Sequence, residues 1–193
     1  MRRVACLVLM LGAFAGLARA QEEPKAPKPP VVRPHGAPRE GPRSVPKIVG
    51  QVYLGEEAPD FELPGSLGDP VKLSLQRGMW TLLVFSDGRA PLIRLRDIAP
   101  NLRKLDVRIL GVCSEKTHAL KSAAVRDSVP FLMLSDVTGE ISMLYGLYDY
   151  EHSEIRPGFV LLDRKGIVKM ALLGQSLPEE QVAELVRFAV GGL

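Results

Sequence analysis

Two apolar runs constrain the fold of this chain more than any other feature of its sequence. Residues 80–85 (Trp-Thr-Leu-Leu-Val-Phe) and Val107–Cys113 are nearly continuous in hydrophobic side chains. Short runs of this kind are typical of strands that are buried on both faces of a sheet. Between them, leucine and isoleucine recur at helical spacing from Leu92 to Leu105. A helix that joins two buried strands is a crossover connection, so the sequence predicts an α/β domain.

The rest of the domain continues this alternation of strands and helices. Residues 71–75 alternate like an edge strand, and Pro100 is expected to kink or split the helix before the second apolar run. A helix is predicted over 114–127 with Ser114 as N-cap, followed by a strand over 131–134 and a helix over 140–145 that ends at Gly146. Strands over 158–163 and 167–173 are expected to form a hairpin. A last helix is predicted from the capping box Ser176-Leu177-Pro178-Glu179 to Gly191-Gly192. This order predicts a thioredoxin-like fold, a mixed central sheet with helices on both faces.

The first twenty residues have the features of a secretory signal peptide. Arg2 and Arg3 form a positive start, residues 4–17 are an apolar run, and Ala18-Arg19-Ala20 is a small-residue cleavage site. The sequence therefore predicts export to a periplasm or out of the cell, with a mature chain that begins near Gln21. The alternative is an uncleaved anchor; after cleavage, no remaining stretch is long enough to span a bilayer.

Residues 21–47 are a proline-rich segment that divides the signal peptide from the folded domain. They hold eight of the 16 prolines of the chain, and their only strong hydrophobes are Val31, Val32 and Val45. A segment with so few hydrophobes cannot bury enough surface to offset its ordering entropy, so we expect a disordered or polyproline-like spacer. The alternative is an arm that binds a cell wall, a membrane or a partner. The domain is then expected over residues 48–193.

Charge and cysteine content exclude two classes of protein. Cleavage would remove Arg2, Arg3 and Arg19 from the 25 basic residues and leave 22, which equals the 22 acidic residues. A chain of zero net charge without a basic stripe is not expected to bind nucleic acid. Cleavage would also remove Cys6 and leave Cys113 alone, so no internal disulfide is expected and the domain must fold on its hydrophobic core.

Five short motifs occur in the order and spacing of a known family. They are residues 55–63 (Gly-Glu-Glu-Ala-Pro-Asp-Phe-Glu-Leu), residues 82–85 (Leu-Leu-Val-Phe), residues 109–112 (Ile-Leu-Gly-Val), Leu134-Ser135-Asp136 with Tyr145-Gly146, and the set Arg156, Phe159, Asp163 and Gly166. Together they resemble the peroxiredoxins, the AhpC/TSA or redoxin group of thioredoxin-like proteins. The resemblance implies a thioredoxin-like fold and, in the family, peroxide reduction by a thiolate at a helix N-terminus.

The thiol that this chemistry needs is missing from its expected place. The family carries P-x-x-x-T-x-x-C directly after the central strand. Counted from Phe85, the proline falls on Asp87, the threonine on Pro91 and the cysteine on Arg94. No cysteine occurs between Ser86 and Val112, so a small shift of the alignment does not restore it. We therefore expect a domain that has lost its peroxidatic cysteine.

The arginine that faces the thiolate in the family is matched by Arg156. With Arg94 at the cysteine position and Arg89 nearby, two or three cations are expected around one helix N-terminus. They would repel one another unless an anion lies between them. The sequence leaves two alternatives: an internal carboxylate, Asp87 or Asp136, or a weak site for a bound carboxylate, sulfate or phosphate held by these arginines.

Cys113 is the other candidate for chemistry. It should end the strand beside the central one, at the carboxyl edge where open α/β sheets place their sites. The following helix N-terminus would favour its thiolate. The alternative, which the apolar strand favours, is a small buried hydrophobic side chain that alkylates slowly in the folded protein.

Metal and cofactor chemistry find no support in the sequence. His35 lies in the spacer, His118 on a predicted helix and His152 in a polar loop, and none has cysteine or carboxylate partners at ligand spacing. We therefore predict no metal site and no cofactor. The partners are unknown, with a protein partner or a homo-oligomer open.

These observations support one reading of function and leave one alternative. The first is an exported peroxiredoxin-like domain that is catalytically degenerate and has a binding or structural role. The alternative is a thiol-dependent antioxidant oxidoreductase or peroxidase that works through Cys113. A third possibility is that the proline-rich arm is the working part and the domain its folded anchor.

Overall fold

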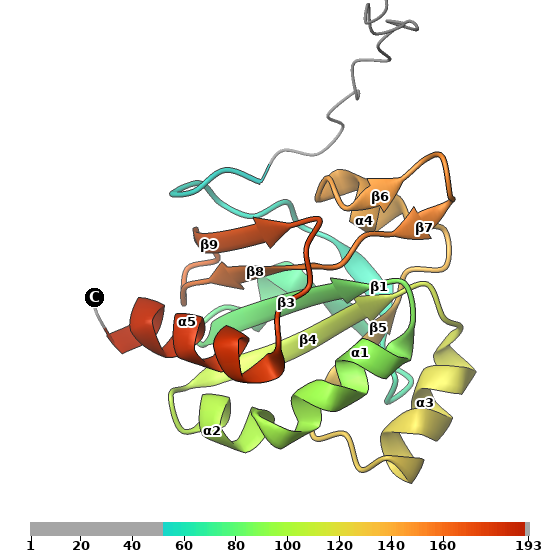
Figure 1. The fold of residues 1–193 in the computed structure, drawn as a ribbon, viewed down its shortest axis with the longest axis horizontal. Helices are drawn as coiled ribbons and strands as arrows, with labels where there is room; N and C mark the ends of the chain where they lie inside the picture. The colour runs from blue at the N-terminus through green and yellow to red at the C-terminus, as the bar shows by residue number, and fades with distance from the viewer. Residues whose placement is uncertain (1–51, 192–193) are drawn as a thin grey trace, which may run out of the picture. The chain divides into compact units, whose positions relative to one another are not determined.

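A five-stranded sheet runs through the centre of the domain in the computed structural model, which describes residues 52–191 (Figure 1). Its strands lie in the order β5 (Leu132–Ser135), β4 (Val107–Cys113), β3 (Trp80–Ser86), β8 (Gly158–Leu162) and β9 (Val168–Leu173). The pairs β3–β4 and β4–β5 are parallel, whereas β3–β8 and β8–β9 are antiparallel. The predicted mixed sheet of a thioredoxin-like fold is therefore confirmed, and both apolar runs form central strands.

Helices precede, connect and follow these strands. They are η1 (Leu73–Gln76), α1 (Arg89–Arg94), η2 (Leu95–Asp97), α2 (Ala99–Arg103), α3 (Thr117–Arg126), α4 (Glu140–Leu144) and α5 (Glu179–Gly191). Two small antiparallel ribbons, β1 (Glu62–Pro64) with β2 (Pro70–Lys72) and β6 (Tyr148–Asp149) with β7 (Glu154–Ile155), complete the domain. Within residues 52–191, no helix combines the length and the hydrophobicity that crossing a bilayer requires.

The sheet is buried on both faces, which explains why its central strands are apolar at nearly every position. Leu82 packs into a cluster with side chains of α1, α2, α3 and α5, while the next residue, Leu83, packs into a second cluster on the other face. Ile141 of α4 and Leu63 of β1 belong to that second face. Helices therefore cover both faces, as the sequence predicts.

Close contact between α1 and β4 depends on one glycine. A methyl group at Gly111 would lie 2.9 Å from the Cδ1 atom of Leu92, a side chain that is fully buried. The absence of a side chain at position 111 lets the helix lie directly on the strand. This contact sets the height of α1 above the sheet and, with it, the position of the residues on the helix.

Three sequence predictions about local structure need correction. The edge strand predicted over 71–75 stops at Lys72, and η1 begins at the next residue, Leu73. The helix predicted before the second run is split into α1, η2 and α2, and Pro100 lies in the first turn of α2, where its missing N–H leaves no helical bond unmade. Ser114 does not cap α3, which begins at Thr117 after Lys116. The predictions for residues 1–20 and 21–47 concern segments outside the described residues.

Candidate functional site

A groove of about 320 Å³ lies at the carboxyl end of β3, at the place where the family motifs locate their chemistry. Its walls come from α1, from the segment before β8 and from the start of α5. Pro91, Leu95, Ile155 and Phe159 supply apolar surface. The charged side chains in its lining are Asp87, Arg94, Glu154 and Glu179. A groove of this size and polarity suits a small ligand or a few residues of a peptide.

The position of the missing thiol is taken by an ion pair. Arg94 is the last residue of α1, and its side chain is 63% exposed. Its Nε donates to Oε1 of Glu179 at 2.6 Å. The pair therefore bridges α1 and the first turn of α5 across the groove. The capping box predicts that the Glu179 carboxylate bonds to the backbone at the start of its own helix. In the structure, this carboxylate pairs with Arg94.

The N-terminus of α1 has a carboxylate of its own. Oε1 of Glu115 accepts the backbone N–H of Arg89 at 2.9 Å, and the other oxygen pairs with the Arg89 guanidinium. A helix N-terminus favours negative charge because its first N–H groups have no partner within the helix. In the family that the sequence resembles, a thiolate is the negative charge at this helix N-terminus. In this chain, the carboxylate of Glu115 supplies the negative charge.

Asp87 ties loops together rather than pairing with Arg156. One of its carboxylate oxygens accepts the backbone N–H of Ile155 at 3.2 Å and lies 3.4 Å from the Ser114 hydroxyl oxygen. The same hydroxyl donates to the backbone carbonyl of Asp87, while α3 begins only at Thr117. Asp136 is likewise engaged locally, because it accepts the Ser142 hydroxyl at 2.7 Å.

Arg156 pairs with Asp149, a residue that the sequence analysis does not single out. Its Nη2 lies 2.8 Å from Oδ2 of Asp149, and its Nε lies 3.2 Å from the same oxygen. The Arg156 hydrogen bond, together with backbone N–H donors from His152 and Glu151, holds the pKa of Asp149 well below its usual range despite partial desolvation. The expected partners of Arg156, Asp87 and Asp136, were therefore wrong. The cause is the short β6–β7 ribbon, which places Asp149 beside Arg156.

Each of the three arginines of the hypothetical anion site has a carboxylate partner of its own. Arg89 pairs with Glu115, Arg94 with Glu179 and Arg156 with Asp149. The repulsion that motivates an external anion is thus relieved by three separate carboxylates. The arrangement agrees with the alternative of internal carboxylates. The carboxylates are Glu115, Glu179 and Asp149, and not the expected Asp87 or Asp136.

Cys113 lies at the end of β4, as expected, and is fully buried. In the sheet register it stands between Ser86 of β3 and Ser135 of β5. Burial raises the pKa of its thiol from 9.0 to about 11, an effect that hydrogen bonding from the Glu115 backbone and the charge of Arg89 only partly offset. The thiol is therefore almost entirely protonated at neutral pH, which makes it a poor nucleophile. The predicted burial of Cys113 is confirmed.

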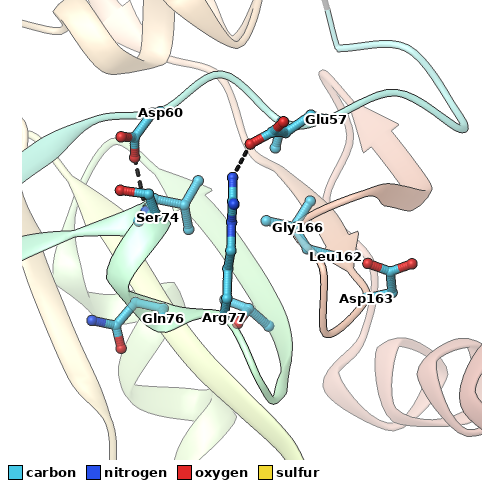
Figure 2. A pocket seen from close by; sticks show the side chains of 11 residues that line it. Glu57, Asp60, Ser74, Gln76, Arg77, Leu162, Asp163 and Gly166 are labelled. Carbon is cyan, nitrogen blue, oxygen red and sulfur yellow. Dashed lines mark hydrogen bonds and ion pairs between the residues drawn. The ribbon is translucent and has the colours of Figure 1, made fainter.

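The opening motif has a structural role on the far side of the domain. Figure 2 shows Asp60 directed at Ser74 and Arg77 directed at Glu57. These side chains line a small cavity of about 20 Å³. The Asp60 carboxylate accepts the backbone N–H groups of Ser74 at 2.8 Å and of Phe61 at 3.0 Å. The carbonyl of Pro59 accepts the buried Tyr145 hydroxyl at 2.7 Å. These bonds fasten the segment before β1 to the core, and the cavity has room for about one water molecule.

Metal ligands do not gather anywhere in residues 52–191, where no group of three histidine, cysteine or acidic side chains is placed to hold an ion. His152 lies 3.3 Å from Oδ2 of Asp149 through its Nδ1 and belongs to the Arg156 cluster. His118 is exposed on α3, and His35 is outside the described residues.

Sheet order, strand direction and the place of α1 at the carboxyl edge define a thioredoxin-fold protein. Solved structures agree: peroxidoxin BcpB from Mycobacterium tuberculosis superimposes with a TM-score of 0.66 at 16% identity, over 74% of this chain and 99% of that one. AhpC from Enterococcus faecalis gives a TM-score of 0.62 at 16% identity, over 69% of this chain and 90% of that one. At such identities the likeness concerns the fold.

The chain belongs to the AhpC/TSA family, whose model matches residues 54–171. Among curated relatives, the selenocysteine-containing peroxiredoxin PrxU of Peptoclostridium acidaminophilum is 32% identical over 134 residues, which cover 61% of this chain and 66% of the relative. Peroxiredoxin Bcp of Bacillus subtilis is 26% identical over 127 residues, which cover 60% of this chain and 81% of the relative. The family assignment from the five motifs is thereby confirmed.

Sequence reasoning missed the three carboxylates that neutralise the arginines. Glu115 could have been found, because it follows β4 at the same sheet edge as the start of α1. Glu179 offered no such signal, since 85 residues separate it from Arg94. Asp149 lies only seven residues before Arg156, but the sequence did not indicate the ribbon that brings the two together.

Proposed function

We propose that this protein has a binding or structural role in place of peroxide reduction. The observation that carries the proposal is the Arg94–Glu179 ion pair at the position where the family motif places its cysteine. Peroxide reduction needs a nucleophilic thiolate that attacks one oxygen of the O–O bond, so that the other oxygen leaves as water or an alcohol and the sulfur becomes a sulfenic acid. An arginine cannot do this, and its partner Glu179 fills the adjacent space.

The groove beside α1 is the surface that such a role would use. Its apolar walls remain, and Asp87 and Glu154 at its lining form no ion pair among the residues that the structure describes. The α1 N-terminus, which would otherwise attract an anion, already has Glu115. These features favour an uncharged or cationic ligand in the groove over an anionic one.

The alternative function is a thiol peroxidase that works through Cys113. What favours it is that the curated relatives named above are peroxiredoxins. Against it stand the full burial of Cys113 and the raised pKa of its thiol. It would require an opening of the structure that exposes the sulfur to peroxide.

A peroxide-consumption assay with hydrogen peroxide and an alkyl hydroperoxide, with a thiol reductant supplied, separates the two functions. We expect a second-order rate constant below about 10⁴ M⁻¹s⁻¹, the low end of ordinary enzyme efficiency. The control is Cys113→Ser measured beside the unchanged protein. A faster rate that disappears in Cys113→Ser would refute the binding role and establish the alternative.

We also propose that the protein is exported, on the strength of the charged start, the apolar run and the Ala18-Arg19-Ala20 site. In that setting a single cysteine would meet oxidising conditions, which its burial in the domain would resist.

A further inference from the structure

A second pocket, of about 240 Å³, lies at the amino end of β4, on the sheet edge opposite to the groove beside α1. It occupies a notch in the sheet. β5 pairs with β4 only from Leu110 onward, while β3 pairs with β4 from Val107. Residues 107–109 therefore have a strand neighbour on the β3 side only, and Pro130 and Phe131, just before β5, line the hollow beside them.

The walls of this pocket are mostly apolar. Val107 and Ile109 are buried at its base, and Met79, Phe131 and Leu132 are half-buried around it. A hollow lined by such side chains gains free energy when an apolar group of matching size replaces water in it.

Two arginines lie at the rim of the pocket. Nη2 of Arg103, in the last turn of α2, donates to the carbonyl of Pro130 at 2.9 Å. Arg108 of β4 donates to the side-chain oxygen of Gln76, and its Nη2 lies 3.2 Å from the sulfur of Met79. Pro130 and Met79 both line the pocket, so each arginine contacts a residue of its lining.

The charge of these arginines is not balanced locally. No acidic residue lines the pocket, and no carboxylate within residues 52–191 forms an ion pair with Arg103 or Arg108. Asp106, which lies between them in the sequence, pairs with Arg164 at 2.8 Å. A guanidinium group has five N–H donors, so each arginine keeps donors for a further partner.

We propose that this pocket binds a small monocarboxylic acid with an apolar body. The guanidinium groups of Arg103 and Arg108 hold the carboxylate, and the body lies against Val107, Ile109 and Phe131. Guanidinium–carboxylate hydrogen bonds are charge-assisted and directional, which makes arginine the preferred residue for this recognition. The apolar walls select against small hydrophilic acids. This site is independent of the groove beside α1 and of whether the protein reduces peroxides.

Titration of the full chain with octanoate tests the proposal, with 1-octanol and octylamine as probes of the same chain length. Calorimetry and thermal melting report binding, and methyl NMR shifts locate it. We expect octanoate to bind at least tenfold more tightly than either control and to shift the methyl signals of Val107, Ile109 and Leu132. Equal binding of 1-octanol, shifts confined to other methyl groups, or no binding up to about 10 mM would overturn the proposal.

Two variants assign the charge recognition to the rim. Arg103→Gln and Arg108→Gln should each weaken octanoate binding about tenfold or more, while Arg187→Gln, at an exposed position on α5 outside the pocket, should leave it unchanged. Arg103 is exposed, so its replacement should not prevent folding. If the half-buried Arg108 proves necessary for folding, Arg103→Gln alone tests whether the rim binds the carboxylate. Unchanged affinity in Arg103→Gln would refute the assignment.

Discussion

At the scale of single residues, charge pairs occupy the cysteine position of the family motif and the start of the helix that carries it. The negative charge at the start of α1 comes from Glu115, and the cysteine position carries Arg94 paired with Glu179. These pairs are partly exposed, so each stabilises the fold by about 1 kcal/mol or less. They also occupy space at the end of β3, and Glu115 takes up a backbone N–H at the start of α1.

The thiol of Cys113 should be slow to react in the folded protein. Burial raises its pKa from 9.0 to about 11, which lowers the thiolate fraction at neutral pH about 100-fold before access is considered. Alkylation with iodoacetamide at pH 7, followed by mass spectrometry of the peptide that contains Cys113, should be slow in buffer and fast in denaturant. Equal rates in the two conditions would show that the sulfur is accessible and would strengthen the peroxidase alternative.

The Asp149–Arg156 pair should make stability depend on pH in the acid range. The pKa of Asp149 is lowered in the folded protein, chiefly by Arg156. The pair is therefore fully stabilising above the pKa of an unfolded aspartate, about 3.9, and its contribution is lost as the pH falls through the lower folded value.

Asp149→Asn should accordingly lower the melting temperature at pH 7, and the difference from the unchanged protein should shrink below about pH 4. Thermal melts over pH 2–7 measure this, with Glu184→Gln on the exposed side of α5 as the control. A difference that stays constant down to pH 2 would show that Asp149 acts through its backbone contacts rather than its charge.

At the scale of elements, the position of α1 decides what the site can be. The helix lies on β4 because Gly111 has no side chain, and Leu92 fills that space. The contact holds Arg89 within reach of Glu115 and Arg94 within reach of Glu179. A change in this packing would therefore disturb both ion pairs together.

Gly111→Ala should destabilise the domain by about 1–3 kcal/mol, the usual effect of forcing an extra methyl group into a packed core. The new methyl would lie 2.9 Å from Leu92, closer than such atoms approach. Denaturant unfolding measures the change. Gly191→Ala, where no atom lies within 4 Å of the added methyl, should not destabilise the domain, and an equal loss in both variants would contradict the packing explanation.

At the scale of the whole molecule, the folded domain carries two hollows at opposite edges of one sheet. The charged side chains of the groove beside α1 are three carboxylates and one arginine, whereas the pocket at the start of β4 has two arginines and no carboxylate. Their opposite charge predicts ligands of opposite sign. Binding at one edge is therefore separable from binding at the other by mutation.

Export is the prediction that concerns the whole chain. The mature protein isolated from the exported fraction of its natural host should begin at Gln21 or within a residue or two of it, because Ala18-Arg19-Ala20 fits the cleavage site of a signal peptide. Intact-mass measurement decides this. A mature protein that retains Met1 to Ala20 would contradict cleavage and favour the uncleaved anchor.

The sequence by itself determined the main strands, the family and the absence of the thiol. Residues 80–85 and Val107–Cys113 predict central strands because a strand buried on both faces must be apolar throughout, and that requirement is local. The loss of the cysteine is likewise readable, since the motif is counted along the chain from Phe85. The burial of Cys113 follows from its place at the end of the second run.

Only the tertiary structure decided what surrounds Arg94, the residue at the cysteine position of the family motif. The partners of Arg89 and Arg94 lie 26 and 85 residues away in the sequence, so they meet only when the sheet and α5 have assembled. The pocket at the start of β4 exists because β5 begins three residues further along than β4, a register that pairing of the two strands sets. The strands depend on the local pattern of hydrophobic residues, so the sequence predicted them. The ion pairs and the cavities depend on distances between residues far apart in the chain, so the sequence did not predict them.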